Sequence, residues 1–208
     1  MSEHHSRVTH LRTHTRAAHK SIETVPALAR LLAPDLGRGE YADVLLAMQA
    51  FHAAAEPDIA LALEGLPAAQ SLLDGRRLRA LSDDLAFLGT APWPASPAPL
   101  ALANRAEAIG ALYVIEGASL GGRVIARHIA DSLDLAPGAG ASFYGGLSAD
   151  AARERWGRLS AVLEDPAIEI DLHDLAHGAC KTFECLERWM RRVAVAEAPH
   201  TLAVSAAA

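Results

Sequence analysis

Apolar residues recur at spacings of three and four along most of this 208-residue chain, which is the period of an α-helix. The helical segments, in approximate bounds, are 6–32, 39–63, 69–88, 99–133, 148–163 and 168–193. Pro26 and Pro57 fall inside the first two segments, where a proline bends or ends a helix. The chain shows no repeat, no strand pair and no heptad array. The pattern therefore predicts an all-α bundle.

The stretches between these segments are typical of surface connections. Residues 34–37 form a turn pattern, residues 89–99 carry four prolines, and residues 137–146 are rich in glycine. Four prolines would suit a domain linker, but the helices on both sides each have an apolar face that needs a partner. We therefore expect one helical domain over residues 1–193, followed by an alanine-rich, disordered tail over residues 194–208.

Composition supports this fold class and argues against several functions. Alanine and leucine dominate, only 5% of residues are aromatic, and the net charge is −6. No basic block suggests a nucleic-acid partner. No apolar stretch approaches the roughly 20 residues that span a bilayer, and residues 1–12 lack the apolar centre of a secretion signal. We expect a cytoplasmic protein that binds neither nucleic acid nor membrane.

The two cysteines, Cys180 and Cys185, lie five residues apart in one helical segment. That spacing separates them by about 140° around the helix, which does not suit an intrahelical disulfide. We expect both to be packing residues.

Three glycines interrupt an otherwise strong helical segment at Gly117, Gly121 and Gly122. In an exposed helix interior they would cost roughly 2–3 kcal/mol relative to alanines. A bend, close approach of another helix, or close approach of a ligand to bare backbone would each explain them. Helical spacing puts Gly117 and Gly121 on one face with Gly122 beside them, and leaves the three explanations open.

The first helical segment carries a polar side formed by Arg12, Thr15, Arg16, His19 and Glu23, which are spaced three and four apart. An imidazole with a carboxylate one turn later suits an axial iron ligand whose second N–H is hydrogen bonded. Cationic side chains two turns earlier suit anionic groups of the same ligand. A solvated polar face would show the same spacing.

Taken together, these two stretches resemble the heme oxygenase family. Residues 11–23 (LRTHTRAAHKSIE) are similar to its proximal helix, and residues 110–128 (GALYVIEGASLGGRVIARH) to its distal helix in a bacterial form. Residues 155–156 (RW) and 182–189 (TFECLERW) fit its last two helices. The matching segments spread over about residues 8–190, and their order and spacing make the combination specific. The resemblance implies an all-α, single-domain bundle of the heme oxygenase type with a glycine-kinked distal helix.

The resemblance also implies a role for each proximal residue. His19 would ligate the iron of heme b, and Glu23 would stand near its imidazole. Arg12 and Arg16 match basic positions near the heme propionates, and Thr15 shares their side of the helix.

On the penultimate helix, Arg153 fits a similar basic position. A surface role is the alternative for Arg153 and for Arg155.

On the distal side, Gly117 and Gly121 match glycines that let a helix pass close over the heme face, with Gly122 beside them. Bare backbone there would steer dioxygen toward the porphyrin edge, which makes Gly117 and Gly121 the catalytic candidates. One departure concerns protons: animal-type members carry an aspartate directly after the first distal glycine, whereas this chain has Ala118. The remaining candidates for the proton route are Ser119, Arg123, Arg127 and bridging waters. Glu116 flanks the glycines and receives no role.

The activity implied by the resemblance is oxidative cleavage of heme to biliverdin, carbon monoxide and free iron. Dioxygen and external electrons are consumed, and heme is both substrate and cofactor. A ferredoxin or ferredoxin reductase would supply the electrons, and a phytochrome could receive the bilin. The sequence leaves open which meso carbon is cleaved, which donor serves, and whether the reaction supplies iron or bilin.

Three other functions fit parts of the pattern. A heme carrier or sensor that never degrades its ligand would keep His19 but has less need of bare glycine. A di-iron oxidase would need Glu-x-x-His pairs, which the central helices lack. His173 and His177 could hold a metal with nearby aspartates, although we expect an exposed helix face there. A thiaminase-like hydrolase would need a nucleophilic cysteine.

Overall fold

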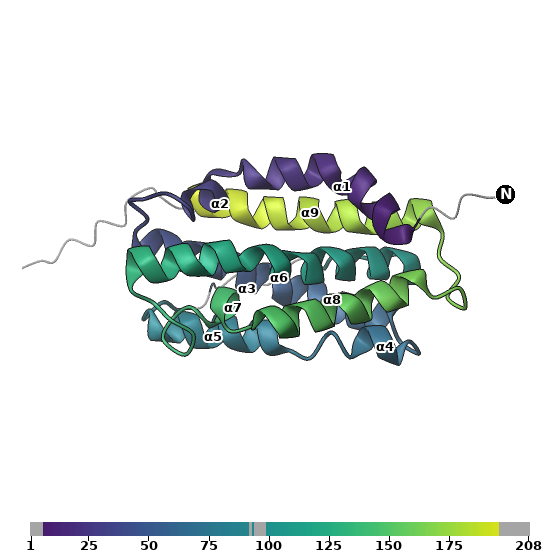
Figure 1. Cartoon of the computed structure of the whole chain (residues 1–208). Helices are drawn as coiled ribbons and strands as arrows, with labels where there is room; N and C mark the ends of the chain where they lie inside the picture. The colour runs from purple at the N-terminus through teal and green to yellow at the C-terminus, as the bar shows by residue number, and fades with distance from the viewer. Residues whose placement is uncertain (1–5, 92, 94–98, 196–208) are drawn as a thin grey trace, which may run out of the picture.

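The computed structural model describes residues 6–91, 93 and 99–195. Within these residues the chain forms nine helices and no strand longer than isolated bridges at Ala136 (Figure 1). The helices are α1 (Arg7–Glu23), α2 (Pro26–Arg30), α3 (Arg38–Ala62), α4 (Pro67–Gln70), α5 (Arg76–Phe87), α6 (Arg105–Leu133), α7 (Ser142–Gly145), α8 (Ala149–Glu164) and α9 (Leu172–Val195). The predicted all-α fold is confirmed.

The differences from the predicted segments have local causes. The first segment divides because Pro26 starts the short α2, where its missing N–H is not needed. The third divides into α4 and α5 at Gly75, whose φ of 70° is a left-handed conformation that favours glycine. Pro57, in contrast, lies inside α3 without ending it. The proline ring itself is exposed on the helix surface.

One predicted connection also differs from the structure. The glycine-rich stretch 137–146 contains the single-turn helix α7. The predicted tail over 194–208 and most of the proline-rich connection lie outside the described residues, apart from the end of α9.

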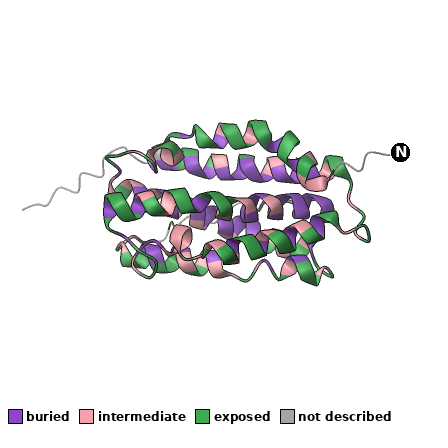
Figure 2. Cartoon of the chain, viewed as in Figure 1, coloured by how far each residue is buried: buried purple, intermediate pink, exposed green. Residues whose placement is uncertain are grey.

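Helix α9 lies at the centre of the bundle. It packs against α6, α1, α3 and α2, while α8, α5 and α7 cover the other side of α6 and α3 (Figure 1). Buried residues follow α9 and the first half of α6, and exposed residues follow the outer side of α1 (Figure 2). Helices α1, α6 and α9 run in the same direction (Figure 1). Both α1 and α6 therefore rest on α9.

The crossing of α6 and α9 depends on two glycines. A Cβ added to Gly110 would lie 2.0 Å from the backbone carbonyl oxygen of Leu175, and one added to Gly178 would lie 2.1 Å from the backbone carbonyl oxygen of Glu107. Both neighbours are backbone atoms, so neither can rotate away. These glycines, rather than the three in the distal motif, allow the close approach of another helix.

We expect Gly110→Ala to destabilise the fold by about 3 kcal/mol, because the added methyl group forces two packed helices apart. Urea unfolding followed by circular dichroism measures this loss. Gly39→Ala is the matched control, because a Cβ at Gly39 meets no atom within 4 Å. Equal midpoints for the two variants would contradict the expectation.

Helix α6 corrects one expectation from the sequence. It is long and apolar enough, by length and composition alone, to cross a membrane, although the sequence predicts no such stretch. Half of its most apolar window is buried inside the fold, where α6 packs on α3, α7, α8 and α9. A core helix meets the same criterion, so this feature is weak evidence for a membrane span.

Candidate functional site

The exposed side of α1 carries the proposed proximal residues. The His19 side chain is 61% exposed, its Nδ1 atom lies 3.3 Å from Glu23 Oε1, and its ring meets Phe183 of α9 edge-on. Arg12 and Arg16 are also exposed. With Nδ1 turned toward a carboxylate, the imidazole has Nε2 available for a ligand outside the helix.

Thr15 does not share this exposed side. It is 3% exposed, and its hydroxyl donates to the Leu11 carbonyl one turn earlier at 2.8 Å. It therefore faces the packed side of α1, and its hydroxyl is already satisfied. The structure separates Thr15 from the four residues with which the sequence grouped it.

Two contacts give the register between α6 and α9. Asn104 Nδ2 donates to Asp174 at 2.7 Å, and His177 Nδ1 lies 2.9 Å from Glu107 Oε1. In both pairs the partners are 70 residues apart in the chain. Because α6 and α9 run in the same direction, a residue of α6 lies level along the bundle with the residue of α9 whose number is 70 higher (Figure 1).

The register brings the proximal histidine close to the level of the first distal glycine, Gly117. His19 meets Phe183, and Ser21 donates to Glu187 at 3.2 Å. The 70-residue offset sets Glu187 level with Gly117. His19 therefore lies within about one helical turn of Gly117 along the bundle axis.

The three distal glycines have different surroundings. A Cβ at Gly121 would meet nothing within 4 Å, one at Gly117 would lie 3.7 Å from the Trp156 ring, and one at Gly122 would lie 3.5 Å from Tyr144. Gly122 is buried against α7, whereas Gly121 is exposed. Only Gly121 therefore presents backbone to open space, as close approach of a ligand requires.

The glycines do not break the helix, because α6 continues without interruption from Arg105 to Leu133. Next to Gly121, the side chains of Leu120 and Val124 are 42% and 64% exposed. Large apolar side chains this exposed on a helix that is otherwise buried along one side form an apolar surface beside the bare backbone.

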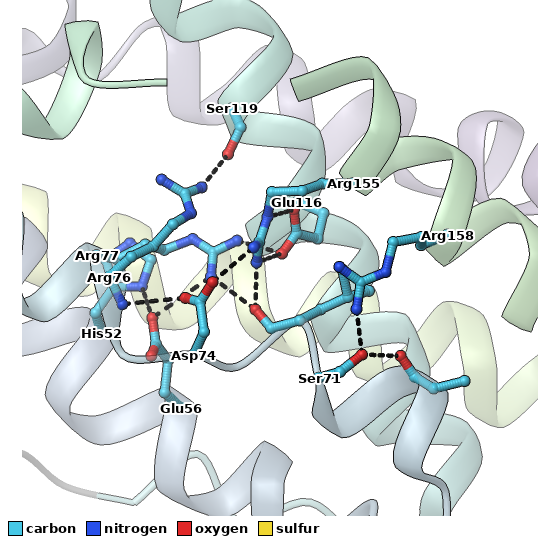
Figure 3. A network of polar contacts seen from close by, with 12 residues as sticks. His52, Glu56, Ser71, Asp74, Arg76, Arg77, Glu116, Ser119, Arg155 and Arg158 are labelled. Carbon is cyan, nitrogen blue, oxygen red and sulfur yellow. Dashed lines mark hydrogen bonds and ion pairs between the residues drawn. The ribbon is translucent and has the colours of Figure 1, made fainter. Parts of the chain in front are cut away.

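Directly before Gly117, Glu116 forms the centre of a buried ionic cluster (Figure 3). Its side chain is 1% exposed. Arg77 Nη2 donates to its Oε1 at 2.5 Å, while Arg155 donates to Oε1 at 2.8 Å and to Oε2 at 3.1 Å. Burial opposes ionisation, but the hydrogen bonds from Arg155 and the charge of Arg77 outweigh it and hold the pKa of Glu116 below its ordinary value.

The cluster extends to α3 and to the connection before α5. Arg155 also donates to Asp74 at 2.8 Å and to the Leu72 carbonyl, and Arg77 Nη1 lies 3.8 Å from Glu56 of α3. The side chain of Arg155 is only 9% exposed, which rules out the surface role considered for it.

A third arginine, Arg76, connects this cluster to the distal helix. Its Nη2 donates to Ser119 Oγ at 3.2 Å (Figure 3). Its buried Nε–H and the buried Tyr144 hydroxyl have no hydrogen-bond partner among the described residues. Burial and the charges of Arg77 and Arg155 lower the pKa of Arg76 to about 10. Unpartnered buried donors beside the glycines fit a site that receives water or a polar ligand atom.

The sequence suggested no role for Glu116, Arg77 or His52, although a signal was present. Glu116 and His52 each stand in a long apolar run, and an ionisable group in such a run needs a buried partner. The partners could not be found from spacing, because Glu116 is 39 residues from both Arg77 and Arg155.

A comparison with models of protein families completes this picture. The family model described as heme oxygenase matches residues 6–192, which include α1, α6 and the whole of the site. The chain belongs to the heme oxygenase family.

Relatives of known name agree with the family. The heme oxygenase of Xanthomonas campestris is 42% identical over 89 residues, which cover 43% of this chain and 51% of that protein. The matched segment thus spans about half the length of this curated relative.

Solved heme oxygenase structures share the fold. The enzyme from Synechocystis in complex with heme has a TM-score of 0.70 at 17% identity, covering 91% of this chain and 92% of that one. The Leptospira interrogans enzyme has a TM-score of 0.71 at 20% identity, covering 90% and 100%. The NO- and CO-bound Neisseria meningitidis enzyme has a TM-score of 0.68 at 23% identity, covering 90% of this chain and 92% of that one.

The remaining predicted heme oxygenase residue, Arg153, lies on the exposed side of α8. It pairs with Asp150 one turn earlier, and its side chain is 67% exposed. The structure thus gives Arg153 a local partner on its own helix, and its contact with a propionate stays a prediction.

The rival sites find little support in the described structure. Asp171, His173 and Asp174 are close enough to hold a metal ion, but the His173 side chain is 87% exposed. Cys180 and Cys185 are both free, and burial raises the pKa of each thiol, which opposes formation of a nucleophilic thiolate. Cys185 is a buried packing residue, as predicted, and Cys180 is half-buried.

Buried His52 makes stability depend on pH. Its ring lies 3.1 Å from Glu56 and edge-on to Phe143, and burial lowers its pKa below the ordinary 6.5. The unfolded chain therefore binds the proton more readily, so the free energy of unfolding falls as the pH drops below about 6.5, by up to about 1.4 kcal/mol per pH unit.

Denaturant unfolding between pH 7.5 and 5 measures this dependence. We expect His52→Gln to flatten it, whereas His14→Gln, which replaces an exposed histidine of α1, should leave it unchanged. An unchanged slope in His52→Gln would contradict the assignment.

Proposed function

We propose that this protein is a heme oxygenase that opens the heme ring oxidatively to biliverdin, carbon monoxide and free iron. The observation that carries the proposal is that His19, open to solvent, lies within about one helical turn of Gly117 along the bundle, where the bare backbone of Gly121 one turn further on is also open to solvent. Family membership across residues 6–192 supports the same reaction.

The residues present fit heme b. His19 would hold the iron through Nε2, while Glu23 at 3.3 Å would accept the Nδ1 proton and orient the ring. The exposed guanidinium groups of Arg12 and Arg16 suit the two propionates, and Arg153 is a further candidate. When bound, heme supplies both the iron that activates dioxygen and the ring that is oxidised.

On the distal side, this chain provides backbone and hydrogen-bond donors instead of a carboxylate. Gly121 keeps side chains away from the ligand face, and Gly117 lies against the Trp156 ring of α8. Ala118 has no proton to give, so we assign proton delivery to Ser119, held by Arg76, together with water bound at the unpartnered Arg76 Nε–H. Arg123 and Arg127, both exposed, can exchange protons with solvent along the same helix.

Partners and location follow from this reaction. We propose dioxygen as co-substrate, a ferredoxin or ferredoxin reductase as electron donor, a phytochrome as a possible bilin acceptor, and the cytoplasm as location. The exposed cations Arg12, Arg16 and Lys20 on α1 would favour an acidic donor.

The deciding experiment adds hemin to the purified protein and then supplies ascorbate or a ferredoxin reductase system in air. A falling Soret band with a growing bilin spectrum is the expected result, and chromatography of the product identifies the biliverdin isomer. Stable reduced heme without ring opening would instead identify a heme carrier or sensor.

A further inference from the structure

Two neighbouring pairs join α6 to α8 at the first distal glycine. Glu116 bonds Arg155, and in the next position of both helices Gly117 lies against the Trp156 ring, 3.7 Å from where its Cβ would be. Trp156 also contacts Tyr113, with 5.6 Å between ring centroids. The ionic pair therefore sets both the position of α6 and the position of the ring that covers Gly117.

The same carboxylate joins α6 to α5. Arg77 Nη2 reaches Glu116 Oε1, and the side chain of Arg77 is 3% exposed (Figure 3). Both arginines also reach the Leu72 carbonyl in the connection before α5. Glu116 of α6 thus binds arginines from two other helices, and these arginines in turn bind the connection before α5.

Beyond Glu116, α6 accepts a hydrogen bond from Arg76 at Ser119 and packs on Tyr144 at Gly122, before it is buried again at Ile129. Residues 109–112 and 114–116 of α6 are buried. After Gly117, in contrast, Ala118, Leu120, Gly121 and Val124 are exposed. Glycine also makes this part of the helix less stable than alanine would. The buried ionic contacts of Glu116 therefore stand directly beside this segment and hold its near end to two other helices.

We propose that Glu116 is a positioning residue: clamped by Arg77 and Arg155, it fixes the height and rotation of Gly117–Gly121 over the substrate. This rests on the proposed function, but it assigns a task to a residue that does not itself touch the ligand. A purely structural buried ion pair would stabilise the whole fold without controlling the glycines in particular.

The chain offers a matched control on the same helix. Glu107 is also buried, with 5% of its side chain exposed, and is also held by two side chains, since His177 Nδ1 lies 2.9 Å and Lys181 Nζ 3.2 Å from its carboxylate oxygens. It lies nine residues before Glu116, away from the glycines. Glu107→Gln and Glu116→Gln make the same chemical change at two buried sites of α6.

The experiment measures hydrogen exchange of the α6 amides in the heme-free protein by mass spectrometry. In Glu116→Gln we expect amides of residues 117–124 to exchange at least about tenfold faster than in the unmodified protein, because a lost buried attachment favours local opening. Glu107→Gln should leave that segment unchanged. Equal exchange of the segment in both variants overturns the proposal.

A second readout uses the hemin complex. A shifted distal helix should alter the mixture of biliverdin isomers in Glu116→Gln but not in Glu107→Gln, and unaltered isomers together with unaltered exchange overturn the proposal. If neither protein forms biliverdin, the proposed function fails, while the exchange data still test the positioning role. Should Glu116→Gln not fold, Glu116→Asp keeps the charge and should show a smaller increase in exchange over the same segment.

Discussion

Replacing His19 by alanine should reduce biliverdin formation by about 1000-fold or more. Loss of a group that merely hydrogen bonds a metal ligand costs 10–100-fold, and loss of the ligand itself removes the iron's attachment to the protein. Some hemin association should remain, because the apolar surface at Leu120 and Val124 is unaffected. Single-turnover assays of the hemin complex and spectra of its reduced form measure both effects.

The fold should not suffer from this change. The His19 side chain is 61% exposed, and alanine is a better helix former than histidine. The free energy of unfolding should therefore stay within about 1 kcal/mol of the original value. His14→Ala, on the exposed side of the same helix, is the matched control and should retain turnover. If His19→Ala keeps normal turnover and normal reduced-heme spectra, His19 is not the ligand.

A phenylalanine at position 121 should lower biliverdin yield by about 100-fold, or roughly 2.7 kcal/mol of transition-state free energy. The ring would occupy the space that bare backbone leaves open over the substrate. Because a Cβ at Gly121 meets no atom within 4 Å, the heme-free protein should fold normally. Hemin titration, carbon monoxide binding and bilin yield measure the obstruction.

Gly157→Phe provides the comparison. Gly157 lies exposed on α8, and a Cβ there also meets nothing within 4 Å, so this variant adds the same ring to an open helix surface outside the site. Gly121→Ala should give an intermediate yield. Normal yields in Gly121→Phe would reduce that glycine to a feature of the helix surface.

The sequence predicted most helices because their apolar periodicity is local information. One boundary failed where a single residue's conformation decided it, at Gly75, whereas the predicted segment 39–63 agrees with α3 although Pro57 lies inside it. The close crossing through Gly110 and Gly178 was not foreseen, because it depends on how two distant helices pack.

The candidate site was likewise predictable from the sequence only where local spacing, and not packing between distant helices, decides the geometry. His19 lies within about one helical turn of Gly117 along the bundle, and the exposed side of α1 agrees with the helical spacing of Arg12, Arg16 and His19. Thr15 differs because it stands at the edge of that side, where packing against neighbouring helices decides its direction. The Glu116 cluster could not be assembled from sequence, since its members come from separate helices and the surface role considered for Arg155 suited its sequence equally well.

The contrast between the exposed His19–Glu23 pair and the buried Glu116 cluster has a consequence for ionic strength. Dissolved ions screen charges that water can reach, over about 8–10 Å at ordinary salt, and act far less on desolvated ones. The carboxylate beside His19 and the arginines on α1 stand in solvent, whereas Glu116 and Arg77 do not. Added salt should therefore weaken the binding of an anionic ligand by α1, while α6 keeps its geometry. Substrate affinity should fall as salt is added, and the product isomer should stay unchanged.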